Sequence, residues 1–411
     1  MSAVNAQAML PSSVPFAPYG KSEREVATAA ATCAMSYASV WFLSAPPFAT
    51  SVATAVSTID WAMSITFAAV VRSGAVVLME QNATGGQSSA PRLTPVVSVS
   101  FPAADALVGD TLALVAVHNG NVVHEHYGEG ISADSTLISW SMAKSFTHAL
   151  VGMAVSDGLL NIDDTHLFPE WDHDERSTIS LRHLLAMSSG LEWVEDYVDD
   201  KVSDVIDMLF GSGSFAGDHA AFAINKTLEA APGTLYKYSS GTTNIITKVL
   251  ARAVGEKPGE SSAMSSFMQT RLFDPLGMTS AVAKFDAAGN FVGSSYIYAT
   301  ARDFAKFGNL YLNDGVVNGE RLLPEGWVHY AAQIVGHEDE MNWDYGAHWW
   351  IPPGDPKAIV AHGYQGQILW VAPHRNLVLV RLGVTDAEFG HDVREQLLGI
   401  AAQFPETASE R

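Results

Sequence analysis

Two apolar segments far apart in the chain constrain its fold more than any other feature. Leu112–Tyr127 consists of two runs rich in β-branched residues that flank Asn119-Gly120. Asn-Gly favours a two-residue hairpin turn because both of its positions need a positive φ. Gly366–Gly383 has a similar arrangement, with two apolar runs around a short turn at Pro373–Asn376. A sheet that uses both segments must bring distant parts of the chain together.

The chain between these two segments has the spacing of helices. Apolar residues recur at helical spacing in Ser139–Leu160, where Gly158 can end the helix. Shorter helices are predicted at Leu181–Met187, Val202–Leu209, Thr242–Val254 and Thr300–Leu312, and a last one runs through Gln403. The pattern predicts an α/β (α+β) fold, in which an antiparallel sheet near residues 108–130 and 343–400 flanks an inserted, mainly helical region.

The chain divides into an N-terminal extension, residues 1–105, and a main domain, residues 106–405. We place the sheet part of that domain at about 106–160 and 300–405, and the helical part at about 161–299. Residues 26–59 carry no charge, but the stretch is rich in Ala, Thr and Ser and is broken by two prolines. The extension is therefore expected to pack on the main domain, and membrane association is disfavoured.

Charge and cysteine content exclude several kinds of partner. The 411 residues carry a net charge of −21 with only 23 Lys and Arg, which argues against nucleic-acid binding. The single cysteine, Cys33, excludes an internal disulfide and a cysteine-based zinc site. No cluster of His, Cys, Asp and Glu has metal-ligand spacing, so no metal and no other cofactor is expected. Localisation stays open: a soluble cytoplasmic protein is favoured over a periplasmic or secreted one, and a homodimer is compatible with the sequence.

Ser141-Met142-Ala143-Lys144 forms an S-x-x-K motif at the start of the first predicted helix. Residues three apart lie on one helix face, so the Lys144 amine can approach the Ser141 hydroxyl. A lysine in apolar surroundings has a lowered pKa and can accept the serine proton. The helix N-terminus also offers a backbone N–H to an oxyanion. The motif alone arises by chance in many chains.

Two further segments gain meaning beside this motif. Tyr238-Ser239-Ser240 precedes a predicted helix, and a tyrosine near a lysine can pass a proton to a leaving group. In isolation, a tyrosine that only packs on a loop would look the same. Gly363 and Gly366 flank Tyr364 at the start of the last hairpin. Glycines in a strand mark a close backbone approach, as an oxyanion hole requires, although an ordinary β-bulge would also carry them.

In combination these segments resemble the serine β-lactamase and penicillin-binding superfamily. That superfamily has S-x-x-K, then Tyr-x-Ser or Tyr-x-Asn roughly a hundred residues later, then a glycine-rich terminal strand. Other segments look most like the 6-aminohexanoate-dimer hydrolases and the class C-like carboxylesterases: Ile179–Leu191, Trp193–Asp199, Phe273–Met278, Gly293–Asp303, Gly319–Val328 and Gly366–Trp370. The resemblance runs from about residue 108 to about residue 400.

The resemblance implies a role for each candidate residue. Ser141 would form the acyl-enzyme, and Lys144 and Tyr238 would share the acid and base work. The backbone N–H groups of Ser141 and Tyr364 would form the oxyanion hole, beside Gly363 and Gly366.

Two positions bear on the substrate. Tyr197 matches the residue that holds the substrate amide in the nylon-oligomer hydrolases. The Lys-Thr-Gly triad that binds a substrate carboxylate in β-lactamases is absent, and Ala361-His362-Gly363-Tyr364 stands there. Without that cation, penicillin hydrolysis and D-Ala-D-Ala cleavage are not expected as main activities.

We therefore expect a serine hydrolase that cleaves a small-molecule ester or amide through a covalent acyl-enzyme on Ser141. A transesterase on the same fold would pass the acyl group to an alcohol, and the sequence does not separate the two. The other alternative is a catalytically silent binding or sensor domain. Such a domain would be expected to have lost at least one of Ser141, Lys144 and Tyr238.

Overall fold

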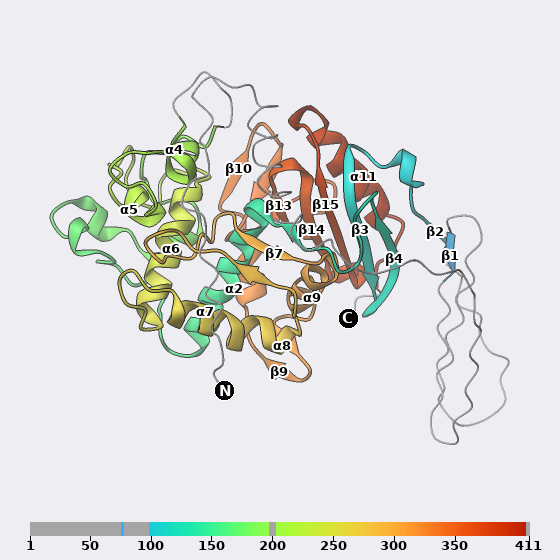
Figure 1. Ribbon diagram of the computed structural model, residues 1–411, viewed down its shortest axis with the longest axis horizontal. Coiled ribbons are helices and arrows are strands. Elements are labelled where there is room, and N and C mark those ends of the chain that lie inside the picture. The colour runs from blue at the N-terminus through green and yellow to red at the C-terminus, as the bar shows by residue number, and fades with distance from the viewer. Residues whose placement is uncertain (1–74, 78–97, 197–202, 408–411) are drawn as a thin grey trace, which may run out of the picture. The chain divides into compact units, whose positions relative to one another are not determined.

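The computed structural model describes residues 75–77, 98–196 and 203–407 (Figure 1). All of them except Asp196 and Ser203 belong to one compact unit. Most of the N-terminal extension predicted at 1–105, including the uncharged stretch 26–59, lies outside the described residues.

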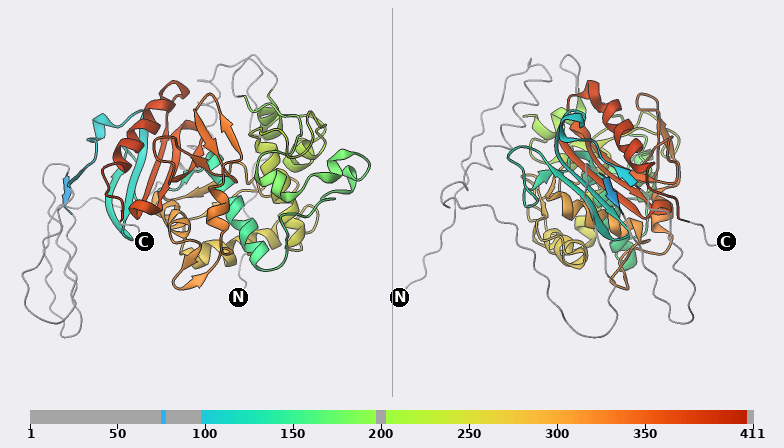
Figure 2. Two further views of the ribbon diagram at one scale, coloured as in Figure 1. Left: turned by 180° about the vertical axis from the view of Figure 1, so that it is seen from behind. Right: turned by 90° about the vertical axis from the view of Figure 1, so that its right-hand side faces the viewer.

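An eight-stranded antiparallel sheet is the largest element of this unit (Figures 1 and 2). In spatial order its strands are β10 (Gly336–Glu338), β11 (Trp343–Tyr345), β12 (Trp350–Ile351), β13 (Ile359–Gly363), β14 (Gln367–Ala372), β15 (Leu377–Val384), β3 (Asp110–His118) and β4 (Asn121–Tyr127). β15 pairs with β3 along nearly its whole length. A strand of the C-terminal hairpin therefore lies directly beside one from the N-terminal hairpin, which confirms the predicted sheet and fold class.

Turn residues set the register of both hairpins. Asn119 and Gly120 join β3 to β4 with φ values of 50° and 74°, as their sequence requires. A 3₁₀ turn at Pro373–Arg375, closed by Asn376 at φ 47°, joins β14 to β15. Both hairpins stand where the sequence predicts them.

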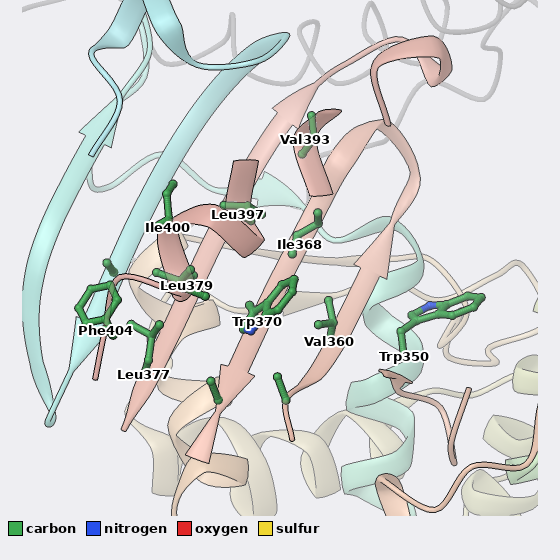
Figure 3. Packing of buried hydrophobic residues seen from close by; sticks show 14 of the residues in the cluster. Trp350, Val360, Ile368, Trp370, Leu377, Leu379, Val393, Leu397, Ile400 and Phe404 are labelled. Carbon is green, nitrogen blue, oxygen red and sulfur yellow. The ribbon is translucent and has the colours of Figure 1, made fainter. Parts of the chain in front are cut away.

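The C-terminal helix α11 (Gly390–Ala401) covers one face of the sheet (Figure 3). Alternate residues of β14 and β15 point toward this helix because side chains of a strand alternate between its faces. The packed residues are all nearly inaccessible to solvent and include Ile368, Trp370, Leu377, Leu379, Val393, Leu397, Ile400 and Phe404. Their burial supplies one of the two hydrophobic layers of the unit.

Helix α9 (Ala301–Leu312) lies on the opposite face of the sheet. Thr300 caps its N-terminus by accepting a hydrogen bond from the Asp303 N–H. A Cβ added at Gly308 would lie 2.6 Å from Val378 and 2.9 Å from Leu369, so glycine permits the close approach of helix and sheet. The second layer is completed by α2 (Ala143–Ser156), which follows Ser141.

The inserted region contains most of the remaining helices (Figure 1). These are α3 (Leu181–Leu185), α4 (Asp204–Phe210), α5 (His219–Ile224), α6 (Ser240–Ala253), α7 (Ser262–Met268) and α8 (Asp274–Leu276), with a π-helical turn at Gln269–Phe273; α10 (Trp327–Ala331) lies later in the chain. The described residues also form three small sheets: β5 (Leu137–Ile138), β7 (Ile297–Ala299) and β6 (Val282–Ala283); β8 (Val316–Val317) and β9 (Glu320–Arg321); and, before the main sheet in the chain, β1 (Ala75–Val77) and β2 (Ser98–Ser100).

Two predicted helix boundaries need correction. The helix predicted from Ser139 begins at Ala143, because Trp140 has a φ of 43° and a 3₁₀ turn precedes the helix. The helix predicted to reach Met187 ends at Leu185, since Met187 itself is left-handed at φ 52°. The inserted region, predicted as mainly helical, also contains β6 and β7, which are too short to show a strand pattern in the sequence.

Candidate active site

Ser141 lies in the 3₁₀ turn Trp140–Met142, immediately before α2. The preceding Ser139 fastens this turn to the inserted region. Its N–H donates to the Ile297 carbonyl over 2.8 Å, and its hydroxyl lies 3.1 Å from the Ser295 carbonyl oxygen. Ser141 is partly exposed, whereas the helix residues that follow it are buried. The turn therefore leaves the Ser141 hydroxyl accessible at the start of a buried helix.

Lys144 is buried one helical turn beyond Ser141, with 1% of its surface exposed. Its Nζ lies 3.0 Å from Ser141 Oγ, 2.9 Å from Ser240 Oγ and 3.1 Å from the Ser294 carbonyl oxygen. Burial lowers the pKa of Lys144 to about 8, against an opposing effect of the Glu195 carboxylate. A substantial fraction of this amine is therefore neutral in mildly alkaline solution.

Tyr238 lies beside both of these residues. Lys144 Nζ is 4.7 Å from the centre of its ring, and the ring packs against Tyr345 and Trp350. Burial and then the charge of Glu195 raise the pKa of the Tyr238 phenol far above its usual range, while a hydrogen bond with the Ser141 side chain acts in the opposite direction. The phenol is held in its protonated form.

Glu195 and Ser240 complete the surroundings of the amine. The Ser240 hydroxyl donates to Glu195 Oε1 over 2.5 Å, and the Ser240 N–H donates to Glu195 Oε2 over 2.8 Å. Trp193 Nε1 donates to the same Oε2. Sequence reasoning did not assign either residue, although Ser240 occupies the third position of the Tyr-x-Ser segment and Glu195 lies in the Trp193–Asp199 segment.

The last predicted element also reaches the nucleophile turn. A Cβ at Gly363 would lie 2.4 Å from the Ser139 carbonyl oxygen and 3.0 Å from the Ser141 nitrogen, so only glycine lets the end of β13 approach this closely. Tyr364 follows and packs its ring edge-on against Trp140, with centres 5.9 Å apart. The structure thus brings together Ser141, Lys144, Tyr238, Gly363 and Tyr364 from three distant stretches of sequence.

Gly366 lies at the end of the same turn, at φ 77°. His362 precedes the turn, and burial followed by the charges of Arg394 and Arg381 lowers its pKa to about 3. With Gly363 as the glycine of the Lys-Thr-Gly triad, the uncharged Ala361 stands at the lysine position and the neutral His362 at the threonine position. Tyr197, the residue expected to hold a substrate amide, lies outside the described residues.

The beta-lactamase family profile matches residues 103–402, about three quarters of the chain. The chain belongs to the beta-lactamase family. Among its relatives, a 6-aminohexanoate-dimer hydrolase of Paenarthrobacter ureafaciens is 26% identical over 290 residues, which cover 66% of this chain and 72% of that protein. Membership of this family and a hydrolase relative support a serine hydrolase.

Solved structures agree on the fold. A 6-aminohexanoate-dimer hydrolase homologue from Bacillus anthracis superposes with a TM-score of 0.62 at 24% identity, covering 72% of this chain and 81% of that one. The octameric penicillin-binding protein homologue from Pyrococcus abyssi gives 0.54 at 16% identity, covering 72% and 76% of the two chains. The eight-stranded sheet with its helical insertion is thus the β-lactamase fold.

In residues 98–196 and 203–407, no group of three or more His, Cys, Asp or Glu side chains is arranged to hold a metal ion. Within the same part of the chain, no helix is long and apolar enough to cross a bilayer.

Proposed function

We propose that this protein hydrolyses an ester or amide bond through a covalent acyl-enzyme on Ser141. The observation that carries the proposal is the set of acceptors around Lys144 Nζ. The Ser294 carbonyl can only accept a hydrogen bond, and the Ser240 hydroxyl has already given its proton to Glu195. A neutral amine has two N–H groups and one lone pair, and those two acceptors occupy both N–H groups. The lone pair is left facing the Ser141 hydroxyl 3.0 Å away.

This arrangement makes Lys144 the base for the first step. Lys144 takes the proton as Ser141 Oγ attacks the substrate carbonyl, and the negative charge develops on the carbonyl oxygen. The backbone N–H groups of Ser141 and Tyr364 are the proposed donors to that oxygen, since the close approach of Gly363 sets the two peptide groups side by side.

Tyr238 is the proposed proton carrier to the leaving group. Its phenol remains protonated, so it can donate to a departing alkoxide or amine and recover the proton through Lys144, which lies 4.7 Å from its ring centre. Water then attacks the acyl-enzyme, and the same groups run in reverse. An alcohol in place of water would give the transesterase that the sequence also allows.

The substrate is proposed to lack the carboxylate that β-lactams present to a lysine. Ala361, which carries no charge, stands at the position of that lysine, and the adjacent His362 is neutral. The relative named 6-aminohexanoate-dimer hydrolase favours a linear amide or a simple ester as the substrate class. A silent binding module is disfavoured, because such a module would have no need to keep a buried lysine beside a serine.

A fluorophosphonate probe tests the proposal, together with hydrolysis of p-nitrophenyl esters and linear amide oligomers. Wild-type protein should be labelled and should hydrolyse at least one substrate. Ser141→Ala should lose both properties, whereas the exposed neighbour Ser132→Ala should keep both. Labelling and turnover that survive in Ser141→Ala would overturn the proposal.

A further inference from the structure

The turn that presents Tyr364 has an unusual backbone. Gln365 and Gly366 are both left-handed, at φ 61° and 77°. A left-handed conformation is strained for a residue with a side chain such as Gln365, and such strain persists only where surrounding contacts maintain it. The carbonyl oxygens of Tyr364, Gln365 and Gly366 all accept hydrogen bonds from side chains behind the turn.

Arg381, on the neighbouring strand β15, supplies two of these hydrogen bonds. Its Nη1 donates to the Gln365 and Gly366 carbonyls over 3.0 and 2.9 Å. The guanidinium is 2% exposed, and its other donors go to Thr111 Oγ1, the Val108 carbonyl and Thr385 Oγ1. None of these five acceptors is a carboxylate. Burying a cation among acceptors that carry no charge destabilises the folded protein. Arg381 provides hydrogen bonds to the turn that an apolar side chain could not make.

Gln367 supplies the remaining contact. Its Nε2 donates to the Tyr364 carbonyl over 3.0 Å and to the Gly383 carbonyl over 2.6 Å, and its Oε1 accepts from the Gly383 N–H. The side chain therefore ties the first residue of the turn to β15 at a fixed distance.

We infer that Arg381 and Gln367 are positioning residues that hold the turn Tyr364–Gly366 so that the Tyr364 N–H faces the reacting carbonyl oxygen. This inference rests on the proposed function. Within the part of the chain that the structure describes, neither side chain forms a hydrogen bond with Ser141, Lys144 or Tyr238, so both act through the turn. Arginine suits the position because its planar guanidinium reaches the turn, Thr111 on β3 and Thr385 after β15 at once, which a lysine ammonium cannot do.

The two terminal nitrogens of the Arg381 guanidinium donate to different acceptors, which makes a matched control variant possible. Thr385 Oγ1 accepts a hydrogen bond from Arg381 Nη2, whereas Arg381 Nη1 donates to carbonyls of the turn. The backbone N–H of Thr385 also donates to the Gln365 carbonyl, and this bond remains when the side chain is replaced. Thr385→Val therefore removes an acceptor of Arg381 and no hydrogen bond of the turn. Arg381→Lys keeps the charge and loses the fork.

The experiment measures kcat and KM of both variants on an ester substrate, and their affinity for a trifluoromethyl ketone that adds to a serine hydroxyl and forms an oxyanion. Arg381→Lys should lower kcat by about 10- to 100-fold, less than the 10²- to 10³-fold loss of a whole oxyanion donor, with KM changed by less than about threefold. Its affinity for the ketone should fall by a similar factor. Thr385→Val should keep kcat within about threefold, even where both variants melt at a lower temperature.

Equal kcat losses in the two variants, or a loss confined to KM, would overturn the inference. If Arg381→Lys fails to fold, Gln367→Met decides the matter: it should lower kcat and ketone affinity together by about tenfold, and unchanged values would overturn the inference. If the proposed function itself is wrong, the result is different: Ser141→Ala should then turn over substrate at the wild-type rate.

Discussion

Replacing Glu195 with Gln should shift the pH dependence of catalysis toward acid. Glu195 is linked to Lys144 through the Ser240 hydroxyl by hydrogen bonds of 2.5 and 2.9 Å. Its negative charge favours the protonated lysine, whereas the proposed mechanism needs the neutral amine. Burial already lowers the pKa of Lys144 to about 8, and without the carboxylate that pKa should fall further.

The size of the shift follows from the separation of the charges. Two hydrogen bonds in series place the carboxylate oxygen about 5 Å from Nζ, and at an effective dielectric of about 20 the interaction is about 3 kcal/mol. That energy corresponds to about two pH units, so a shift of at least about one unit is expected after local relaxation.

The assay is the pH profile of kcat/KM, because its acid limb reports the base of the free enzyme. The wild-type limb should lie near the Lys144 pKa of about 8. In Glu195→Gln it should move to lower pH by at least about one unit, so that the variant gains relative activity in acid. Glu192→Gln, an exposed neighbour, controls for the change in net charge and should leave the limb in place. Identical limbs in the two variants would refute the assignment of Lys144 as the base.

Substitutions at three positions test the other roles. Lys144→Ala should lower kcat/KM at least about 10²-fold. Lys144→Arg should lower it nearly as much, because guanidinium stays protonated and cannot act as a base. An active Lys144→Arg variant would assign the base role to Tyr238. Tyr364→Phe should leave turnover almost unchanged, whereas Tyr364→Pro removes the N–H and should cost about 10²- to 10³-fold in kcat, with circular dichroism to check folding. Tyr197→Phe should lower the rate of amide hydrolysis more than that of ester hydrolysis, since an amide nitrogen must be oriented and protonated to leave. Equal losses on a matched ester and amide would mean that Tyr197 only shapes the pocket.

Sequence patterns predicted the parts of this fold that depend on residues close together in the chain. Asn119-Gly120 specifies its turn, and Ser141 and Lys144 meet because three residues separate them near a helix start. The pairing of β15 with β3 followed from the apolar character of two distant hairpins.

Contacts that depend on tertiary packing could not be predicted in this way. Glu195 and Ser240 are 45 positions apart, and no local pattern links a carboxylate to a particular serine over that distance. Arg381 lies in an otherwise apolar strand, where the sequence gives no sign that its acceptors are the carbonyls of a turn. The left-handed φ of Trp140, 43°, is likewise set by the surrounding structure.

The central claim is that Ser141 carries the acyl group, and mass spectrometry of the protein mixed with a slowly hydrolysed ester tests it most directly. The protein should gain the mass of one acyl group, the modified peptide should contain Ser141, and the gain should vanish in Ser141→Ala but persist in Ser132→Ala. An acyl group on any other residue, or ester turnover by Ser141→Ala at the wild-type rate, would contradict the account.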